Sequence, residues 1–418
     1  MKKLALVIQQ YGREMYGGAE FHCMRLAEGL TSFYQVEVLT TCSLDFLSWA
    51  DHYPEGVSDI NGVTVRRFRV SQLRDWKKME ELEKKVKVQK ADPGKKRSIK
   101  SLFKKLAFWK RNKKASPADY SGWILAQGPA TPDLIDYIRT HEKEYDCLIF
   151  FSYLYYPTFF GVGIQPEKTI LVPLAHEEWA VYMPVFKSVF TRPACIMYNT
   201  EAEKKLVNRI SGNQSVYSEI AGIWVNVPGE LPEQDMKTEM KIYSDYVLYV
   251  GRIDDNKLPS EDLQWFLKYV GETKKDIKLV LTGNLYRELP VSDHILYLGF
   301  VTETAKFNLI RQSLFLFQPS RFESLSMVVL EAFSMEKPVL VHEYCEVMRD
   351  HVDKSNGGLY YHDYPGFKKA FDKLSGDQRL NAAAGISGKK YVDSNYLEDI
   401  IVGKYRHVIE NRISNQKK

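Results

Sequence analysis

The feature that most constrains the fold of this 418-residue chain is a repeated alternation of short apolar runs with amphipathic helical stretches. In the first half this pattern predicts strands at residues 4–8, 36–40, 63–70, 148–151, 170–172 and 196–198, and helices at 19–30, 132–141 and 200–209. Such alternation is typical of parallel βαβ units, not of a β-sandwich. We therefore expect an α/β protein with doubly wound parallel sheets.

The alternation stops at a Pro-containing connection, Pro228-Gly229-Glu230-Leu231-Pro232-Glu233, and then starts again. After it we expect strands at 246–250, 277–281, 295–298, 314–317 and 339–341, with helices at 263–270, 305–312 and 327–334. The predicted domains are residues 1–222 and 223–392, followed by a C-terminal helix in 393–418 that packs back across both. Two such sheets form a cleft, and doubly wound sheets bind ligands at the carboxyl ends of their strands.

Charge is unevenly distributed along the chain. Residues 84–114 hold fourteen Lys and Arg against one acidic residue, a net charge of +13. The whole chain carries only +5, so the other 387 residues together carry −8. We interpret this as an acidic protein with a basic insertion, at residues 73–118 of the first domain.

The termini and cysteines favour a cytoplasmic protein. The apolar run at 4–8 is too short for a signal-peptide core, and five cysteines without CxxC or zinc spacing are expected to be reduced thiols. Residues 147–166 carry no charge, but Pro157 and two glycines interrupt them, which favours a buried strand and a short helix over a membrane span. Tyr153, Tyr155 and Tyr156 in this stretch could stack on an acceptor or simply pack in the core.

Two motifs after predicted strands suggest a phosphate and sugar site. Arg252 and Lys257 follow the strand at 246–250, and two cations on a strand-to-helix loop suit a diphosphate, although surface cations are common there. Glu323 follows the strand at 314–317. Glu331 lies within an apolar helical run, where a carboxylate needs a partner. That partner could be two ribose hydroxyls; a buried glutamate with no role in binding is the alternative.

These motifs occur in a recognisable order: VGRIDDNK, LVLTGN, YLGFV and QPSRFESLSMVVLEAFSMEKPVLV. Together they resemble the C-terminal half of family-four retaining glycosyltransferases, which have the GT-B fold. The Glu323-x7-Glu331 spacing matches that family's signature, and the N-terminal Tyr16-Gly17-Gly18-Ala19-Glu20 resembles its Gly-Gly loop. The resemblance covers roughly residues 1–50 and 120–410.

The resemblance implies a role for each matching residue. Arg252 and Lys257 would bind the donor diphosphate, Glu331 the ribose, and Glu323 the donor sugar, as a catalytic residue. Gly17 and Gly18 would let the backbone approach the diphosphate. His176 corresponds to a histidine near the donor sugar in many members, so it is a second candidate catalytic residue; a structural histidine is the alternative.

Ser324, Leu325 and Ser326 stand where many members have Gly-Phe-Gly, and we expect them to contact the donor sugar, whose identity this departure leaves open. The implied reaction is metal-independent transfer with retention at the anomeric carbon. The chain has no Asp-x-Asp, the metal-binding signature of the other major glycosyltransferase fold, and no P-loop or Gly-x-Gly-x-x-Gly motif. We expect no cofactor, with a UDP- or GDP-sugar as the donor substrate.

The basic insertion has a helical pattern at 98–110, with Trp and Phe on its apolar side. This pattern is typical of adsorption to an anionic membrane surface, and a solvated insertion packed on the first domain is the alternative. No nucleic-acid-binding module surrounds the segment, and no nucleic-acid partner is expected.

The sequence therefore predicts a hexosyltransferase-type enzyme (EC 2.4). It would use a nucleotide-sugar donor and a glycan or lipid-linked acceptor in cell-surface polysaccharide or glycolipid biosynthesis. Its expected location is the cytoplasm, with peripheral binding at the inner face of the plasma membrane through residues 84–114. The alternatives are a catalytically silent GT-B scaffold that binds membrane or a partner, and another GT-B enzyme such as a phosphorylase or epimerase.

Overall fold

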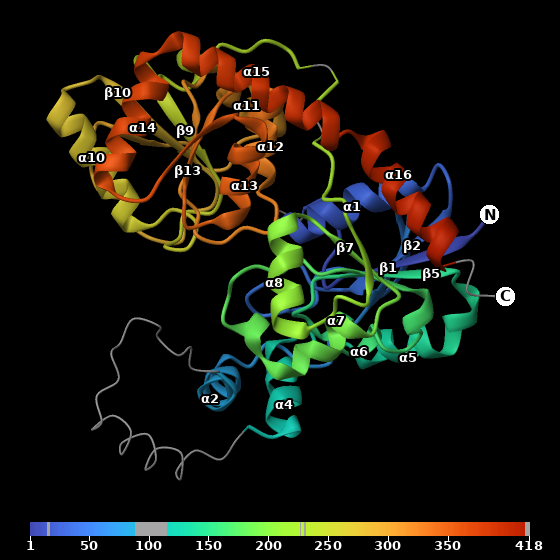
Figure 1. Cartoon of the computed structure of the whole chain (residues 1–418). Helices are drawn as coiled ribbons and strands as arrows, with labels where there is room; N and C mark the ends of the chain where they lie inside the picture. The colour runs from blue at the N-terminus through green and yellow to red at the C-terminus, as the bar shows by residue number, and fades with distance from the viewer. Residues whose placement is uncertain (15–16, 88–114, 226, 230, 414–418) are drawn as a thin grey trace. The chain divides into compact units, whose positions relative to one another are not determined.

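The computed structural model describes residues 1–14, 17–87, 115–225, 227–229 and 231–413. It divides into two compact units (Figure 1). Unit 1 contains Met1–Asn199, Glu203–Ala221 and the residues from Lys404 onward, and unit 2 contains Thr200–Ala202 and Gly222–Gly403. The chain thus passes from one unit to the other after Ala221 and returns within its last helix.

Unit 1 is built on a sheet with the strand order β3-β4-β2-β1-β5-β6-β7-β8 within the described residues. Neighbouring strands are parallel except β3 and β4, which form an antiparallel hairpin. Asn61 and Gly62 connect these two strands with positive φ angles of 55° and 80°, as a two-residue type I′ turn requires. The strands are β1 (Lys3–Val7), β2 (Gln35–Thr41), β3 (Gly56–Ile60), β4 (Val63–Phe68), β5 (Cys147–Phe151), β6 (Thr169–Val172), β7 (Cys195–Tyr198) and β8 (Tyr217–Ile220).

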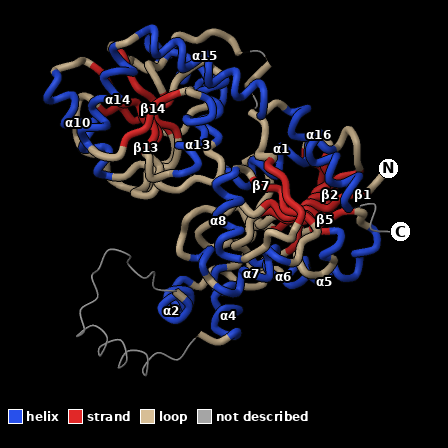
Figure 2. The backbone as a smooth tube through the Cα atoms, in the orientation of Figure 1, coloured by secondary structure: helices blue, strands red, loops and turns tan. Residues whose placement is uncertain are grey.

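Helices cover both faces of this sheet, because successive residues of its central strands are apolar and point to opposite faces. Leu148 and Phe150 of β5 belong to the core beneath α5 and α6, whereas Ile149 and Phe151 point to the other face, where α1 lies (Figures 1 and 2). The helices are α1 (Gly18–Leu30), α2 (Trp76–Val86), α4 (Pro117–Gln127), α5 (Pro132–His141), α6 (Tyr156–Gly161), α7 (Lys187–Thr191) and α8 (Glu201–Ser211).

Unit 2 has an all-parallel sheet with the order β11-β10-β9-β12-β13-β14 among the described residues. Helices α10 and α14 cover one face, and α11, α12, α13 and α15 lie on the other (Figure 1). The strands are β9 (Asp245–Val250), β10 (Ile277–Thr282), β11 (Ile295–Tyr297), β12 (Leu316–Gln318), β13 (Val339–His342) and β14 (Gly358–Tyr361). The helices are α9 (Met236–Glu239), α10 (Ser260–Thr273), α11 (Glu303–Gln312), α12 (Met327–Ser334), α13 (Glu346–Ser355), α14 (Tyr364–Gly376), α15 (Gln378–Asn395) and α16 (Glu398–Val408).

Several predicted boundaries differ from the structure for local reasons. The strand expected at 63–70 ends at Phe68, because the N–H of Val70 donates to the Asp51 carboxylate (3.0 Å) and not to a neighbouring strand. The helix expected across the C-terminal region is broken at Tyr396, whose carbonyl accepts a hydrogen bond from Val225 N (3.2 Å). The helix predicted at 98–110 lies outside the described residues.

The first part of the basic insertion predicted at 73–118 forms a helix that packs in the core of unit 1. Helix α2 contributes Leu82 and Val86 to the unit 1 core and packs against α4. Tyr153 and Tyr156 are buried in the same core, so packing, not acceptor stacking, accounts for them. All five cysteines are free and buried.

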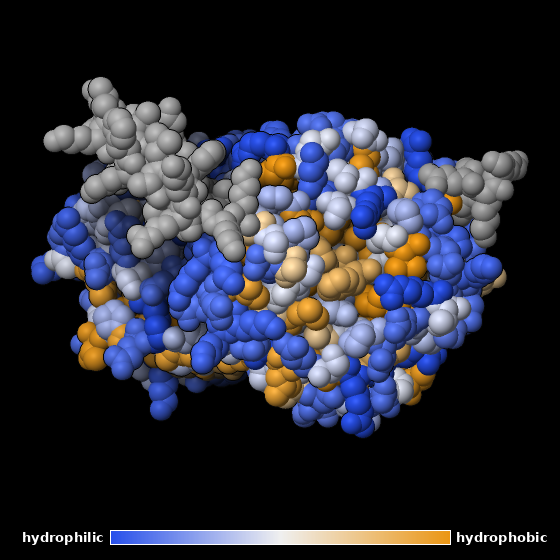
Figure 3. Space-filling view, turned by 90° about the horizontal axis from the view of Figure 1, so that it is seen from below, coloured by the Kyte–Doolittle hydropathy of each residue, from blue (hydrophilic) through white to orange (hydrophobic). Residues whose placement is uncertain are grey.

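The surface view from below shows mostly hydrophilic residues (blue), with apolar residues (orange) gathered in the middle of that face (Figure 3). Exposed large apolar side chains in unit 1 include Phe46, Leu47, Leu73 and Trp76. Within the described ranges, every helix is too short or too polar to cross a membrane.

Candidate active site

The carboxyl ends of the unit 2 strands bring together most of the residues that the sequence singled out. Arg252 follows β9, and the loop 319–326 follows β12, its neighbour in the sheet. The N–H of Arg321 donates to the carbonyl of Asn256 (3.1 Å), which joins the two loops. A third loop approaches at Gly283, after β10: a Cβ there would lie 2.0 Å from the Gly251 carbonyl oxygen, so only glycine fits.

Lys257 and Glu323, predicted as separate ligands of diphosphate and sugar, contact each other. Lys257 Nζ lies 2.7 Å from Glu323 Oε1 and 2.9 Å from the carbonyl oxygen of Phe322. Both side chains are mostly buried, which strengthens the ion pair relative to a surface one. A donor diphosphate would therefore share this cation with Glu323.

Asp254 organises the turn that carries both predicted cations. Its Oδ1 accepts hydrogen bonds from the N–H groups of Asn256 (3.0 Å) and Lys257 (2.9 Å), while Oδ2 lies 3.6 Å from Arg252 Nε. Half of the Arg252 side chain is exposed, so its guanidinium is accessible to an anionic ligand. This turn places the two cations on the same loop, as the sequence suggested.

Glu331, which lies inside an apolar helix and was expected to have a partner, is paired with a lysine. Lys306 Nζ on α11 lies 2.9 Å from Glu331 Oε1 on α12 and 2.9 Å from Glu303 Oε2. Burial lowers the pKa of Lys306, but the charges of Glu331 and Glu303 raise it by more, and the net shift is upward. Glu331 therefore remains paired before any ribose binds.

Helix α13 fixes the position of the Ser324-Leu325-Ser326 segment through a hydrogen bond. The carbonyl oxygen of Leu325 accepts a hydrogen bond from His351 Nε2 (2.8 Å), a residue of α13. Ser326 is the N-cap of α12 with φ = 62°, and its buried Oγ makes no hydrogen bond within the described residues. A left-handed serine at a helix N-terminus is uncommon, and such strain is often found at ligand-binding positions.

Gly17 and Gly18 begin helix α1 of unit 1, and their surroundings differ. A Cβ on Gly17 would lie 1.9 Å from Glu20 Oε2, whereas a Cβ on Gly18 would meet open space. Glu20 is held in turn by Gln9 Nε2, which donates to Oε1 at 2.6 Å, and burial raises the pKa of the Glu20 carboxyl. A side chain at Gly17 would thus have to displace the Glu20 carboxyl, whereas Gly18 is available for a ligand to approach.

His176 lies in the loop after β6 of unit 1, with Nε2 3.9 Å from Glu178 Oε1. The same Glu178 oxygen accepts from Tyr153 OH (2.6 Å). Glu203 fixes this loop, because its carboxylate accepts hydrogen bonds from Ala175 N (2.6 Å) and Asn199 N (2.7 Å). Burial raises the pKa of Glu203 to about 8, although the two N–H donors favour the charged form.

Sequence reasoning missed the residues that hold the site from outside it. Lys306 lies 25 positions from Glu331, and His351 lies 26 positions from Leu325. Glu203 lies 28 positions from Ala175. The one available signal in the sequence was the apolar run around Glu331. It indicated that this carboxylate has a partner, but it did not indicate which residue that partner is. Among the described residues no three His, Cys, Asp or Glu side chains are grouped as metal ligands would be.

Residues 232–391 match the family model described as glycosyl transferases group 1. No curated protein matches the chain. Among solved structures, the chain is similar to sucrose-phosphate synthase from Thermosynechococcus elongatus (13% identity over 98% of both chains, TM-score 0.67). It is also similar to Anabaena HepE in complex with UDP and glucose (11% identity over 98% of this chain and 99% of that one, TM-score 0.64).

A third similar structure is WaaG, described as a glycosyltransferase involved in lipopolysaccharide biosynthesis (13% identity, 98% of this chain and 100% of that one, TM-score 0.60). At such identities these structures establish the fold alone, and they confirm the predicted architecture of two parallel-sheet domains. This chain therefore has the GT-B fold, and its residues 232–391 match the family model of the glycosyl transferases group 1.

Proposed function

We propose that this protein is a retaining glycosyltransferase that transfers a sugar from a nucleotide-sugar donor to a glycan or lipid-linked acceptor. The observation that carries the proposal is the Lys257–Glu323 pair beside Arg252, at the carboxyl ends of β9 and β12 in the group 1 domain. A UDP- or GDP-sugar is the proposed donor. The similarity to HepE, solved with UDP and glucose, supports UDP.

In this proposal the unit 2 loops bind the diphosphate and stabilise it as it leaves. Arg252 and Lys257 supply positive charge, and Glu331 accepts hydrogen bonds from the ribose hydroxyls. As the bond from the anomeric carbon to the diphosphate breaks, a bond to an acceptor hydroxyl oxygen forms on the same face of the sugar, and the hydroxyl proton passes to the departing diphosphate oxygen. Glu323 and Ser324–Ser326 orient the sugar, and the proposed step uses no metal.

Unit 1 has proposed donor contacts of its own. Gly18 gives the diphosphate room to approach the N-terminus of α1, where unpaired N–H groups favour an anion, with Gly17 beside it. His176 is the proposed donor-sugar contact, held in place through the Glu203-anchored loop. The acceptor is proposed to belong to cell-surface polysaccharide or glycolipid assembly.

The decisive experiment is a calorimetric titration of the full chain with UDP, GDP, dTDP and ADP and their sugars. The chain offers a matched pair of variants, because Glu331 and Glu303 both lie 2.9 Å from Lys306 but only Glu331 is buried. Glu331→Gln should weaken nucleotide binding at least tenfold, and Glu303→Gln should leave it unchanged. If no nucleotide binds, the donor site is wrong and the protein is better described as a silent scaffold.

We also propose that the basic segment, residues 84–114, holds the enzyme at an anionic membrane surface on the cytoplasmic side. The charge of the segment supports this, as do the exposed apolar side chains of Leu73 and Trp76 shortly before it. Flotation with phosphatidylglycerol vesicles tests the proposal. Neutralising the cations of residues 95–114 should abolish recovery with the vesicles, and equal recovery of both proteins would contradict it.

A further inference from the structure

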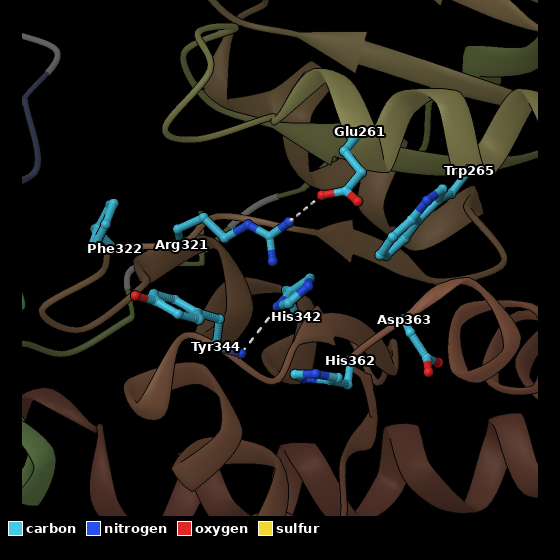
Figure 4. Close-up of a pocket in the computed structure, with 8 residues that line it drawn as sticks. All are labelled: Glu261, Trp265, Arg321, Phe322, His342, Tyr344, His362 and Asp363. Atoms are coloured by element: carbon cyan, nitrogen blue, oxygen red, sulfur yellow. Dashed lines mark hydrogen bonds and ion pairs between the residues drawn. The ribbon is translucent and has the colours of Figure 1, made fainter. Parts of the chain in front are cut away.

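Unit 2 contains a hollow of about 530 Å³ that includes none of the proposed donor-binding residues (Figure 4). It lies where the loops after β12, β13 and β14 meet helix α10, and its volume falls within the range of about 300–1,000 Å³ typical of small-molecule sites. We call it the Trp265 hollow. Its lining includes Glu261, Trp265, Arg321, His342, Tyr344 and Asp363.

The charge of the hollow does not suit an anion. Arg321 is its one guanidinium, and Nη2 is already paired with Asp262 Oδ2 at 2.9 Å and with Glu261 Oε2 at 3.7 Å. Asp262 is fully buried behind the lining, and Glu261 and Asp363 add two more carboxylates. The positive charge is therefore more than balanced, and a phosphate or carboxylate ligand would meet net repulsion.

The hollow nevertheless presents a hydrogen-bond donor that a metal cation could not use. His342 Nδ1 accepts the N–H of Tyr344 (3.0 Å), so the proton of this neutral imidazole lies on Nε2. Burial lowers the pKa of His342 to about 3, which keeps the ring neutral. In Figure 4, His342 lies at the centre of the group, between Arg321 and His362. Donors and carboxylate acceptors in one hollow favour a ligand that can both accept and donate, as a hydroxyl does.

An aromatic platform completes the arrangement. The indole of Trp265 is nearly parallel to the His342 ring (22°, centroids 6.4 Å apart), and an edge-on contact with Tyr361 (5.9 Å) fixes its orientation. Sugars present one face of C–H groups that packs on an indole, while their hydroxyls bond to planar polar side chains. The indole and the polar side chains of the hollow together therefore suit a sugar.

We propose that the Trp265 hollow binds a neutral saccharide, with the sugar ring against Trp265 and its hydroxyls bonded to Glu261, His342 and Asp363. The site is separate from the proposed donor site and does not require it. The two adjoin along the chain, because Arg321 and Phe322 line the hollow and the next residue, Glu323, pairs with Lys257. A bound saccharide would thus contact the same loop that is proposed to hold the donor sugar.

Saturation-transfer NMR and calorimetry of the full chain test this, with the methyl glycosides of glucose, galactose, mannose and N-acetylglucosamine as probes. Trp265→Leu and Glu261→Gln should each weaken binding at least tenfold. Glu261 is largely exposed, so its variant folds even if Trp265→Leu does not. Glu272→Gln is the matched control, because it removes a charge from the same helix outside the hollow.

Glu331→Gln distinguishes this inference from the proposed function, because it should weaken nucleotide binding while leaving saccharide binding unchanged. The inference would be overturned if none of the glycosides binds, or if they bind but neither hollow variant weakens the binding. It would also be overturned if Glu331→Gln abolishes saccharide binding, or if glucose 1-phosphate binds through the same residues more tightly than methyl glucoside does.

Discussion

The buried imidazole of His351 donates a hydrogen bond from Nε2 to the carbonyl oxygen of Leu325, at 2.8 Å, and so connects helix α13 to the proposed donor-sugar loop. The connection continues: Nδ1 contacts Tyr391 OH (3.0 Å), which lies 3.3 Å from Tyr396 OH. The Tyr396 carbonyl accepts from Val225 N in the linker. One hydrogen-bonded series thus joins the loop to the break between α15 and α16 and to the connection at Val225.

Replacing His351 by Leu should destabilise unit 2 by about 1–3 kcal/mol, because it removes the hydrogen bond to the buried Leu325 carbonyl and one of the two partners of the Tyr391 hydroxyl. Urea unfolding followed by circular dichroism measures this loss. The control is His407→Leu, since His407 is exposed on α16. A His351→Leu midpoint equal to that of the control would show that the Leu325 contact contributes little.

Acidification below about pH 6.5 should remove the stability that the neutral His351 ring contributes. Burial lowers the pKa of His351 to about 4, while in the unfolded chain it is about 6.5. Between these values the unfolded state binds a proton and the folded state does not, so unfolding becomes easier as pH drops. The loss for this group approaches about 3 kcal/mol at pH 4. His22 and His342, each with its pKa lowered to about 3, act in the same direction.

Unfolding midpoints measured at pH 7.5 and 4.5 test this, with His351→Gln as the informative variant. The variant should start less stable, and its difference in stability from the natural chain should shrink on acidification, because the contribution of His351 is then lost from the natural chain as well. A pH dependence identical to that of the natural chain would mean that His351 takes up its proton without unfolding.

The fold was predictable because its signals are local, whereas the supports of the site are not. The apolar runs of β9 and β10 and the Asn61-Gly62 turn are each readable within a few residues. Strand β3 was missed because it is exposed along its length and has no apolar alternation. Strand β14 was missed because its short Gly358–Tyr361 run has no strong pattern of its own.

In the candidate site, too, local motifs were predictable and contacts between distant residues were not. Motif spacing placed Lys257 and Glu323 at neighbouring strand ends, since those ends meet at one edge of a parallel sheet. It could not show that they pair with each other, because the contact joins residues 66 positions apart. The sequence also could not show that Lys306 is the partner of Glu331, because this contact depends on how α11 packs against α12 in the folded chain.

Arg321→Met should cost more than a typical surface substitution, about 3–5 kcal/mol, because it leaves the fully buried Asp262 without its cation. Burial already raises the pKa of Asp262 to about 6, and the hydroxyl of Tyr361 is its other partner. Denaturant unfolding of a double-mutant cycle with Asp262→Asn measures the coupling. The double variant should recover much of the loss, and strictly additive losses would contradict the pairing.

Gly18→Ala should separate ligand binding from packing. Because a Cβ at this position meets open space at the start of α1, the variant should be as stable as the natural chain, or up to about 1 kcal/mol more stable. Its turnover with the nucleotide-sugar identified by titration should nevertheless fall at least tenfold, since the added methyl occupies the proposed path of the diphosphate. Thermal unfolding and initial-rate kinetics on the same preparation measure both.

Gly17→Ala is the matching control, and it should behave in the opposite way. Its methyl would lie 1.9 Å from Glu20 Oε2, and the Glu20 carboxylate is not free to move because Gln9 holds it at 2.6 Å. A stability loss of about 1–3 kcal/mol is therefore expected. If Gly18→Ala instead kept full turnover, the open space at Gly18 would not be where the donor binds. The role of this loop would then reduce to the packing that Gly17 provides.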